Sequence, residues 1–260
     1  MKQYTVFGSK GFIGQKMVKV LRLNGHKVWG PNRADPDIYK RPLGHVIYAA
    51  GVTADFRTRP FDTVEAHVCF LSKILKEAKF ESLIYLSSTR LYSGVSKGSE
   101  DTVLHVQSQD PSDLYNLSKL MGESLCLASG RKNVKIARLS NVLGGGDDNF
   151  IASLFREARK GQILLRTALS SKKDYIHVDD VIDLLSVIIK GRHSIYNIAS
   201  GQQVMHGQWV EYFVKLTGCK AKVESGSPEI SFVPIDISRI REEFSFTPRY
   251  IFNDLLWDEN

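Results

Sequence analysis

Residues 8–14 are Gly8-Ser9-Lys10-Gly11-Phe12-Ile13-Gly14, and this run carries the clearest structural signal in the chain. The apolar stretch 4–7 predicts a strand that enters the run, and the apolar spacing over 16–21 predicts a helix that leaves it. Glycine permits a tight turn at position 8, close approach of a pyrophosphate at 11 and close helix packing at 14. The run therefore predicts a nucleotide-binding turn with an anion at the helix N-terminus, although surface turns give the same spacing by chance.

The composition is that of an ordinary soluble globular protein with an anionic partner. The chain has 260 residues, of which 43% are hydrophobic and 24% charged, and its net charge is +7. The partner could be nucleic acid, a membrane surface or a phosphorylated small molecule. Because the positive residues are scattered and no basic tract is interleaved with aromatic residues, we do not expect nucleic acid.

The cysteines and the apolar runs exclude several other classes. Cys69, Cys126 and Cys219 lie far apart, so neither a disulfide framework nor a metal site is indicated. Cys69 and Cys126 fall in apolar helical patterns and are expected in the core. The N-terminus leads directly into a strand without a signal peptide, and no apolar run approaches the ~20 residues that span a bilayer. We therefore expect a cytoplasmic protein without membrane contact.

The end of the second predicted strand, 26–30, bears on the choice of cofactor. In a nucleotide-binding βαβ unit, an acidic residue here contacts the adenosine ribose of NAD. This chain has Asn32 and Arg33 instead, which suit the 2′-phosphate of NADP, and Lys10 could reach the same anion. NADP(H) is therefore favoured and NAD(H) remains possible. The alternative is that Lys10 and Arg33 are only solvated surface charges.

The next stretch predicts a shortened sheet edge. Residues 34–44 are too few to hold a helix, a strand and a second crossover, so one strand is expected to be missing. The strand predicted over 45–51 ends in Ala49, Ala50 and Gly51, whose small side chains would let a flat ligand lie against the backbone.

Strand and helix patterns alternate over the first half of the chain and become irregular later. The spacing predicts helices over 61–80, 115–129, 149–160 and 208–216, and strands over 82–86, 134–139, 163–165 and 194–198. We expect an α/β fold with a Rossmann-like doubly wound parallel sheet. Residues 1–140 would form the NAD(P)-binding domain. Residues 141–260 would form mostly a small C-terminal substrate-binding lobe, with the last sheet strand or strands returning to the Rossmann core.

Two groups of side chains are candidates for chemistry. Ser87-Ser88-Thr89 lies at the carboxyl end of the strand over 82–86, where hydroxyls usually bond the nearby backbone. Tyr115 and Lys119 are four residues apart and share a helical face. An ammonium beside a phenol lowers the pKa of the phenol, which makes it a proton donor and acceptor near neutral pH. By spacing alone, a solvent-facing pair without a role is the more common outcome.

Taken in order, the glycine turn, Ser87-Ser88-Thr89, Tyr115 with Lys119, and Asn141 resemble the extended short-chain dehydrogenase/reductase family. The likeness is to its NAD(P)-dependent branch of nucleotide-sugar epimerases, reductases and dehydratases, and it covers nearly the whole chain, including 174–180 and 196–201. It implies a nucleotide-diphosphate sugar as substrate. It also implies a homodimer built on the helix that contains Tyr115.

The resemblance assigns three catalytic residues. Tyr115 would be the acid and base, and Lys119 would hold the nicotinamide ribose while lowering the pKa of the tyrosine. The family places its catalytic hydroxyl three residues before an aliphatic-tyrosine pair, here Leu91-Tyr92, which selects Ser88.

The resemblance also assigns substrate contacts. Asn141 and Asn149 would lie near the diphosphate, as would Lys173, which stands where the family commonly has arginine. Thr89 and Arg90 are expected beside the substrate. They replace the acidic pair of sugar dehydratases, so we do not expect dehydration.

The sequence differs from the family's pattern at two further places, in the helix predicted over 61–80 and at the shortened edge of the sheet. His67 stands at the family's usual asparagine, which would change how a water or the helix kink is supported. The stretch 34–44 lacks the aspartate that contacts adenine, so Asp35 or Asp37 would substitute, or adenine would be held loosely.

Three functions follow. The first is an NADPH-dependent reductase of a 4-keto nucleotide-diphosphate sugar, because cells keep NADPH reduced for biosynthesis. The second is a nucleotide-sugar epimerase with tightly bound NAD(P). The third is a cofactor-binding protein without turnover, against which the complete set Ser88, Tyr115 and Lys119 argues.

Overall fold

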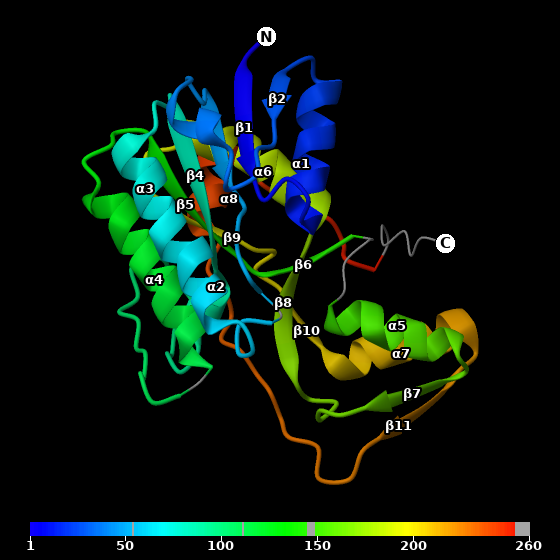
Figure 1. The fold of residues 1–260 in the computed structure, drawn as a ribbon. Coiled ribbons are helices and arrows are strands. Elements are labelled where there is room, and N and C mark those ends of the chain that lie inside the picture. The colour runs from blue at the N-terminus through cyan, green and yellow to red at the C-terminus, as the bar shows by residue number, and fades with distance from the viewer. Residues whose placement is uncertain (54, 111, 145–148, 253–260) are drawn as a thin grey trace.

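A six-stranded parallel sheet forms the centre of the molecule (Figure 1). The computed structural model describes residues 1–53, 55–110, 112–144 and 149–252. The strand order is β2-β1-β3-β4-β5-β9, and every neighbouring pair is parallel. The strands are β1 (Gln3–Phe7), β2 (Lys27–Trp29), β3 (His45–Tyr48), β4 (Ser82–Ser88), β5 (Val134–Leu139) and β9 (Ile195–Ile198). The predicted doubly wound fold is confirmed.

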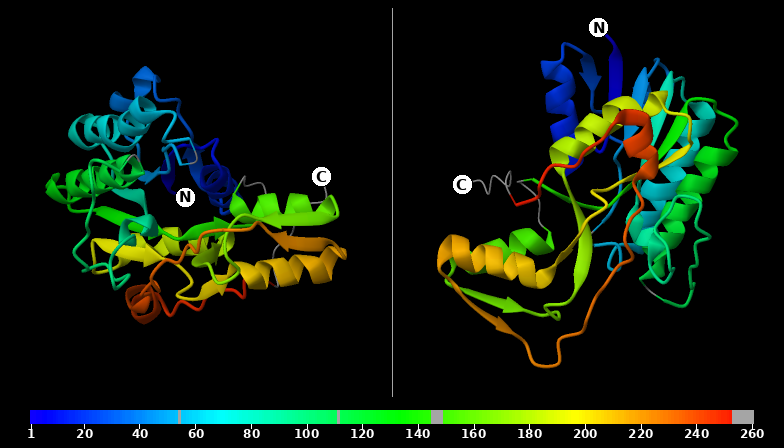
Figure 2. Two further views of the ribbon diagram at one scale, coloured as in Figure 1. Left: turned by 90° about the horizontal axis from the view of Figure 1, so that it is seen from below. Right: turned by 180° about the vertical axis from the view of Figure 1, so that it is seen from behind.

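Helices cover both faces of this sheet (Figures 1 and 2). One face carries α1 (Phe12–Leu23), α6 (Val178–Val187) and α8 (Ser238–Phe244), and the other carries α2 (Pro60–Val64), α3 (Phe70–Glu77) and α4 (Asp113–Ala128). Neighbouring strand residues alternate between the two cores, as with Val6 and Phe7. Burial on both sides explains why the strands are almost continuously apolar.

The edge of the sheet is shortened as predicted. β2 is the outermost strand and pairs only with β1. A single 3-10 turn, Pro36–Tyr39, fills the stretch 34–44 and buries Ile38 completely. The chain then enters β3 on the other side of β1.

A smaller group of elements lies at the carboxyl ends of the main strands (Figure 1). It contains a three-stranded sheet, a two-stranded sheet and two helices around the buried Trp209. These elements are β6 (Asn141–Leu143), β8 (Lys172–His177), β10 (Gln203–Met205), β7 (Gln162–Leu165), β11 (Lys220–Val223), α5 (Phe150–Arg159) and α7 (His206–Thr217). β9, α6 and α8 belong to the main sheet and its helices, although they follow residue 141.

The helix predicted over 61–80 contains an irregularity. Between α2 and α3 the chain makes a π turn, Glu65–Cys69, with His67 completely buried. The expectation that Cys69 is a core residue is wrong, because this turn leaves Cys69 exposed. Cys126 and Cys219 are buried, and all three are free thiols.

None of the helices in the described ranges is both long and apolar enough to cross a membrane. Those ranges also contain no cluster of three or more His, Cys, Asp or Glu side chains arranged to hold a metal ion.

Candidate active site

The glycine turn joins β1 to α1 with very little free space. Gly8 has a φ of +79°, and a Cβ there would lie 2.5 Å from the carbonyl oxygen of Ala49. A side chain at Gly14 would overlap the carbonyl of Gly8, so α1 can approach the turn only with glycine at this position. Gly11 is the N-cap of α1, and its N–H donates to the Gly8 carbonyl at 2.9 Å.

The start of α1 fits an anionic cofactor group. No side chain caps this helix, and its first turn holds no acidic residue. The backbone N–H groups of Phe12, Ile13 and Gly14 occupy the positions that have no acceptor within a helix. Ala49, Ala50 and Gly51 follow β3 beside this turn, where the Ala49 N–H donates to the Phe7 carbonyl at 2.9 Å.

The residues predicted to contact a 2′-phosphate lie at the carboxyl end of β2 and in the glycine turn. Lys10, Asn32 and Arg33 are all exposed. The Asn32 side chain accepts a hydrogen bond from the Ala34 N–H at 3.4 Å. Among the ion pairs of the described residues, none involves Lys10 or Arg33, so both cations are available to an anion.

The nearby acids are occupied within their own turn. Asp35 caps the 3-10 turn by accepting from the Asp37 N–H, and Asp37 lies 3.8 Å from the Lys40 ammonium. An adenine contact from either carboxylate stays a prediction.

Ser88, Tyr115 and Lys119 come together as the sequence predicts. Ser88 is the last residue of β4, and Tyr115 and Lys119 lie on successive turns of α4, which packs on β4. The Ser88 hydroxyl lies close enough to the Tyr115 phenol to lower its pKa, and it accepts from the Arg90 N–H at 3.1 Å. Lys119 Nζ donates to the Leu86 carbonyl at 2.8 Å.

The charges of this group depend on its burial. Burial raises the pKa of Tyr115, while the hydrogen bond from Ser88 and the charge of Arg90 oppose that rise. The pKa of Lys119 is lowered to about 7 by burial, against the attraction of Glu123. The expectation that Lys119 lowers the pKa of Tyr115 is not met in this arrangement, because Lys119 Nζ lies 5.8 Å from the phenol ring centre and bonds the backbone instead.

His67 joins the segment after β3 to the catalytic helix. Its Nε2 accepts from the Val52 N–H at 3.3 Å, so the ring proton lies on Nδ1, which donates to Ser118 Oγ at 2.8 Å. The Ser118 hydroxyl in turn donates to the Tyr115 carbonyl at 2.9 Å. Burial, and then the charge of Lys119, lower the pKa of His67 to about 2, so the ring is neutral.

Two cations of this region, Arg90 and Lys173, form no ion pair with any residue that the structure describes. Arg90 is half-buried, and its Nε has no hydrogen-bond partner among the described residues. Lys173 lies in β8 with its Nζ 5.8 Å from the Phe150 ring centre and 5.5 Å from that of Phe232. The charge of Arg90 contributes to a lowered pKa of Lys173, after the larger effect of burial.

The other predicted substrate contacts hold backbone groups. Thr89 is buried in the turn after β4. The Asn141 amide donates to the Asp174 carbonyl at 2.8 Å. Asn149 caps α5 by accepting from the N–H groups of Ile151 and Ala152.

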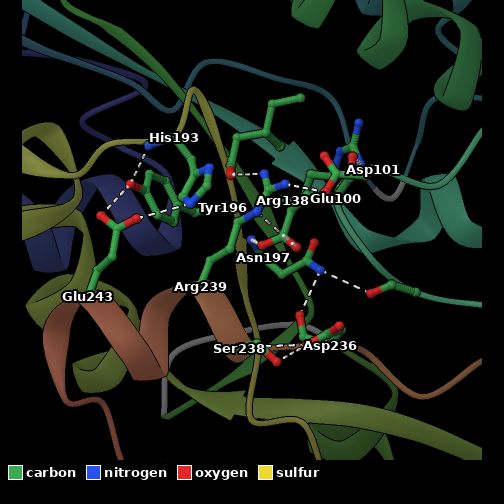
Figure 3. Close-up of polar contacts among 12 residues, drawn as sticks. Glu100, Asp101, Arg138, His193, Tyr196, Asn197, Asp236, Ser238, Arg239 and Glu243 are labelled. Carbon is green, nitrogen blue, oxygen red and sulfur yellow. Dashed lines mark hydrogen bonds and ion pairs between the residues drawn. The ribbon is translucent and has the colours of Figure 1, made fainter.

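A buried polar network, missed in the sequence, supports this site. Glu123 lies on α4 one turn after Lys119, forms a 2.7 Å ion pair with Arg138 of β5, and accepts from the Ser87 hydroxyl at 2.5 Å. Arg138 also connects this network to a second group of polar residues centred on Asn197 of β9. The Asn197 amide donates to the carbonyls of Gly98 and Asp236 (Figure 3). The only local signal was the position of Glu123 four residues after Lys119.

Comparison with models of protein families identifies the family to which this chain belongs. The model of the NAD dependent epimerase/dehydratase family matches residues 4–199. The chain belongs to this family. Epimerase/dehydratase family members are NAD(P)-dependent enzymes of the extended short-chain dehydrogenase/reductase type, so the resemblance seen in the sequence is confirmed.

Solved structures of the epimerase/dehydratase fold superpose on almost the whole chain. MoeE5 in complex with UDP-glucuronic acid and NAD is 22% identical, with 97% of this chain and 96% of that chain covered and a TM-score of 0.83. RMD from Pseudomonas aeruginosa complexed with NADPH is 20% identical, with 98% and 97% covered and a TM-score of 0.83. UDP-glucuronic acid 4-epimerase from Bacillus cereus is 17% identical, with 97% and 96% covered and a TM-score of 0.83. Comparison with curated proteins gave no significant sequence match.

Proposed function

We propose that this protein is an NADPH-dependent reductase of a 4-keto nucleotide-diphosphate sugar. The meeting of Ser88 and Tyr115 carries the proposal, because it places a hydroxyl close enough to a phenol to lower the pKa of that phenol, at the carboxyl end of the main sheet. Ligands of doubly wound sheets bind at this edge. A ketone oxygen placed between the two groups would receive a hydrogen bond from Ser88 and a proton from Tyr115.

The residues around the glycine turn fit NADP(H). The N–H groups at the start of α1 would hold the pyrophosphate, and the small residues 49–51 would lie against the nicotinamide half. Lys10 and Arg33, which have no ion-pair partner among the described residues, support NADP(H) over NAD(H). When bound, the cofactor supplies the hydride for the ketone carbon.

Side chains of the protein donate the proton and stabilise the charge that its loss leaves behind. Tyr115 gives its phenol proton to the sugar oxygen, and Ser88 stabilises the phenolate that remains. Lys119 lies on the same helical face as Tyr115 and would contact the nicotinamide ribose. His67 fixes the carbonyl end of Tyr115 through Ser118, so that the phenol is held in one orientation.

The substrate would lie between the main sheet and the smaller group of elements after residue 141. Lys173 and Asn141 would contact the diphosphate, Asn149 would stand at the start of α5, and Thr89 and Arg90 would face the sugar. The solved structures of MoeE5 contain UDP-glucuronic acid or UDP-glucose, which supports a nucleotide sugar as the substrate class.

Cofactor binding to Arg33→Ala tests the proposal first. We expect the variant to bind NADPH at least about tenfold more weakly and NADH almost unchanged, because only NADPH carries the 2′-phosphate. Arg22→Ala, on the exposed surface of α1, is the matched control. If wild-type protein binds both cofactors equally and Arg33→Ala changes neither, the phosphate-site argument fails.

Loss of absorbance by reduced nicotinamide separates the two enzymatic functions. A reductase consumes NADPH in proportion to the 4-keto sugar added. An epimerase would convert the sugar with no net loss of NADPH.

A further inference from the structure

Arg90 places an unpaired cation beside the reacting group. Its own backbone N–H donates to Ser88 Oγ at 3.1 Å, and its charge acts on the phenol of Tyr115. Its Nε is buried and has no hydrogen-bond partner in the described part of the chain. A buried donor without a partner lowers stability, so a ligand that accepts from it would be bound with selectivity.

The acids near Arg90 do not neutralise it. Asp113 accepts from the Gln107 N–H at 2.6 Å and from the Asn116 amide at 2.7 Å. Asp110 accepts from the Ser112 N–H at 2.7 Å. The charges of both carboxylates attract Arg90, but among the described residues neither forms an ion pair with it, so its N–H donors stay available to another anion.

The surroundings of Arg90 are also cationic and aromatic. The guanidinium carbon of Arg90 lies 5.5 Å from the ring centre of Phe56, and that of Arg57 lies 4.5 Å from the same ring. Phe56 itself is buried and packs on the Tyr115 ring at 5.3 Å between centres. A planar guanidinium held against a ring can present its remaining N–H groups to a carboxylate as a pair of donors.

Arg90 and Lys173 come from different elements, although they lie close enough for the charge of Arg90 to lower the pKa of Lys173. Lys173 comes from β8 in the smaller sheet and lies between Phe150 and Phe232, on the side where the diphosphate is expected. Arg90 follows Ser88 by two residues, and its guanidinium lies over Phe56, whose ring packs on Tyr115. If the sugar ring carries no charge, the diphosphate would supply an anion to Lys173, but no group of the substrate would supply one to Arg90.

We propose that Arg90 binds a carboxylate on the sugar ring, so that the substrate is a nucleotide-diphosphate sugar acid. This inference rests on the proposed function and narrows its substrate class. Arg90 is then the residue that sets specificity for the acidic sugar, while Lys173 contributes to the binding of every nucleotide-diphosphate sugar.

Binding to two matched pairs of ligands tests the proposal. UDP-glucuronic acid with UDP-glucose, and GDP-mannuronic acid with GDP-mannose, differ only in the carboxylate. Calorimetry with NADP+ present should show, in one of the two pairs, that the sugar acid binds at least about tenfold more tightly than its neutral counterpart. A difference of this size is expected from one charge-assisted contact. Arg90→Gln should weaken binding of the acid far more than binding of the neutral sugar, and so remove that preference. Lys173→Gln, the matched control, should weaken both members of the pair alike.

Three results would overturn the proposal. The first is equal binding of acid and neutral sugar in the pair that binds, and the second is no binding of either acid. The third is an Arg90→Gln variant that keeps the preference but shifts the pH profile of turnover, which would assign Arg90 to Tyr115 instead. Turnover of neutral 4-keto sugars with NADPH would then uphold the proposed function while this inference fails.

Discussion

Tyr115 and Lys119 lie on the same face of α4, but their polar groups have different neighbours. The phenol of Tyr115 lies beside Ser88, whereas Lys119 donates to the Leu86 carbonyl. Tyr115→Phe removes the proton donor but keeps the ring and its packing on Phe56. We expect turnover to fall by about a hundredfold or more, with NADPH binding retained. Steady-state rates and cofactor titration measure both, with Tyr4→Phe at the far end of the sheet as control. Unchanged turnover would contradict the proposed proton path.

The pKa of Lys119 predicts how stability depends on pH. An ordinary lysine has a pKa of about 10.4, and burial lowers that of Lys119 to about 7. Between about pH 7 and pH 10 the unfolded chain therefore holds a proton that the folded chain lacks, so this contribution to the free energy of unfolding rises with pH. At lower pH the cost of burying the charge is fully present.

Lys119→Met should remove this dependence. Relative to wild type, the variant should gain stability on the order of a few kcal/mol at pH 6 compared with pH 10. Urea denaturation across that range measures the difference, and the lost hydrogen bond to Leu86 adds an offset that does not change with pH. A difference between the proteins that is constant with pH would show that Lys119 is not desolvated.

Among the elements, α4 has its position fixed by a buried ion pair. Glu123 and Arg138 are each only 4% exposed in their side chains, so the loss of one leaves the other charge unpaired in the core. Arg138→Met should lower the free energy of unfolding by about 3–5 kcal/mol. Arg59→Ala, which removes an ion pair about half exposed on both sides, should change it by less than about 1 kcal/mol. Chemical denaturation compares the two variants. Equal effects would mean that the buried pair does not hold α4.

The π turn of the helix before α3 is the second element that positions the site. His67→Leu removes both hydrogen bonds that join Val52 to Ser118, while His67→Asn keeps a side chain that can donate and accept. We expect the leucine variant to lose turnover more than tenfold, and the asparagine variant to recover part of it. Equal losses in both variants would assign His67 to packing alone.

Across the whole molecule, local patterns predicted the sheet and the shared helical face of Tyr115 and Lys119. The family resemblance selected Ser88, and long-range contacts decided the rest. The strand periods and the glycine turn are local, and so is the spacing of Tyr115 and Lys119. The ion pair of Glu123 with Arg138 joins two elements whose sequence patterns carry no sign of it. Asn149 could have been predicted as a helix N-cap, because asparagine before an apolar helix commonly plays that part. The three-residue strands β6 and β10 are too short for a periodic signal.

The surface of α4 supports the expected homodimer. Met121 and Leu127 on this helix are each 54% exposed, so a second copy of the chain could cover them. Met121→Glu should convert a dimer to a monomer in light scattering, because it would place two like charges in the shared interface. Glu211→Gln on α7 is a control at a distant surface. A monomeric wild-type protein would contradict the prediction.

The fate of the hydride tests the account most directly. Protein is incubated with a 4-keto nucleotide-diphosphate sugar and NADPH carrying two deuterium atoms at the reactive nicotinamide carbon, and the product is analysed by mass spectrometry and NMR. We predict one deuterium at the former ketone carbon for each NADPH consumed, and no product with Tyr115→Phe. Sugar conversion without loss of NADPH, or a product free of deuterium, would contradict a reductase.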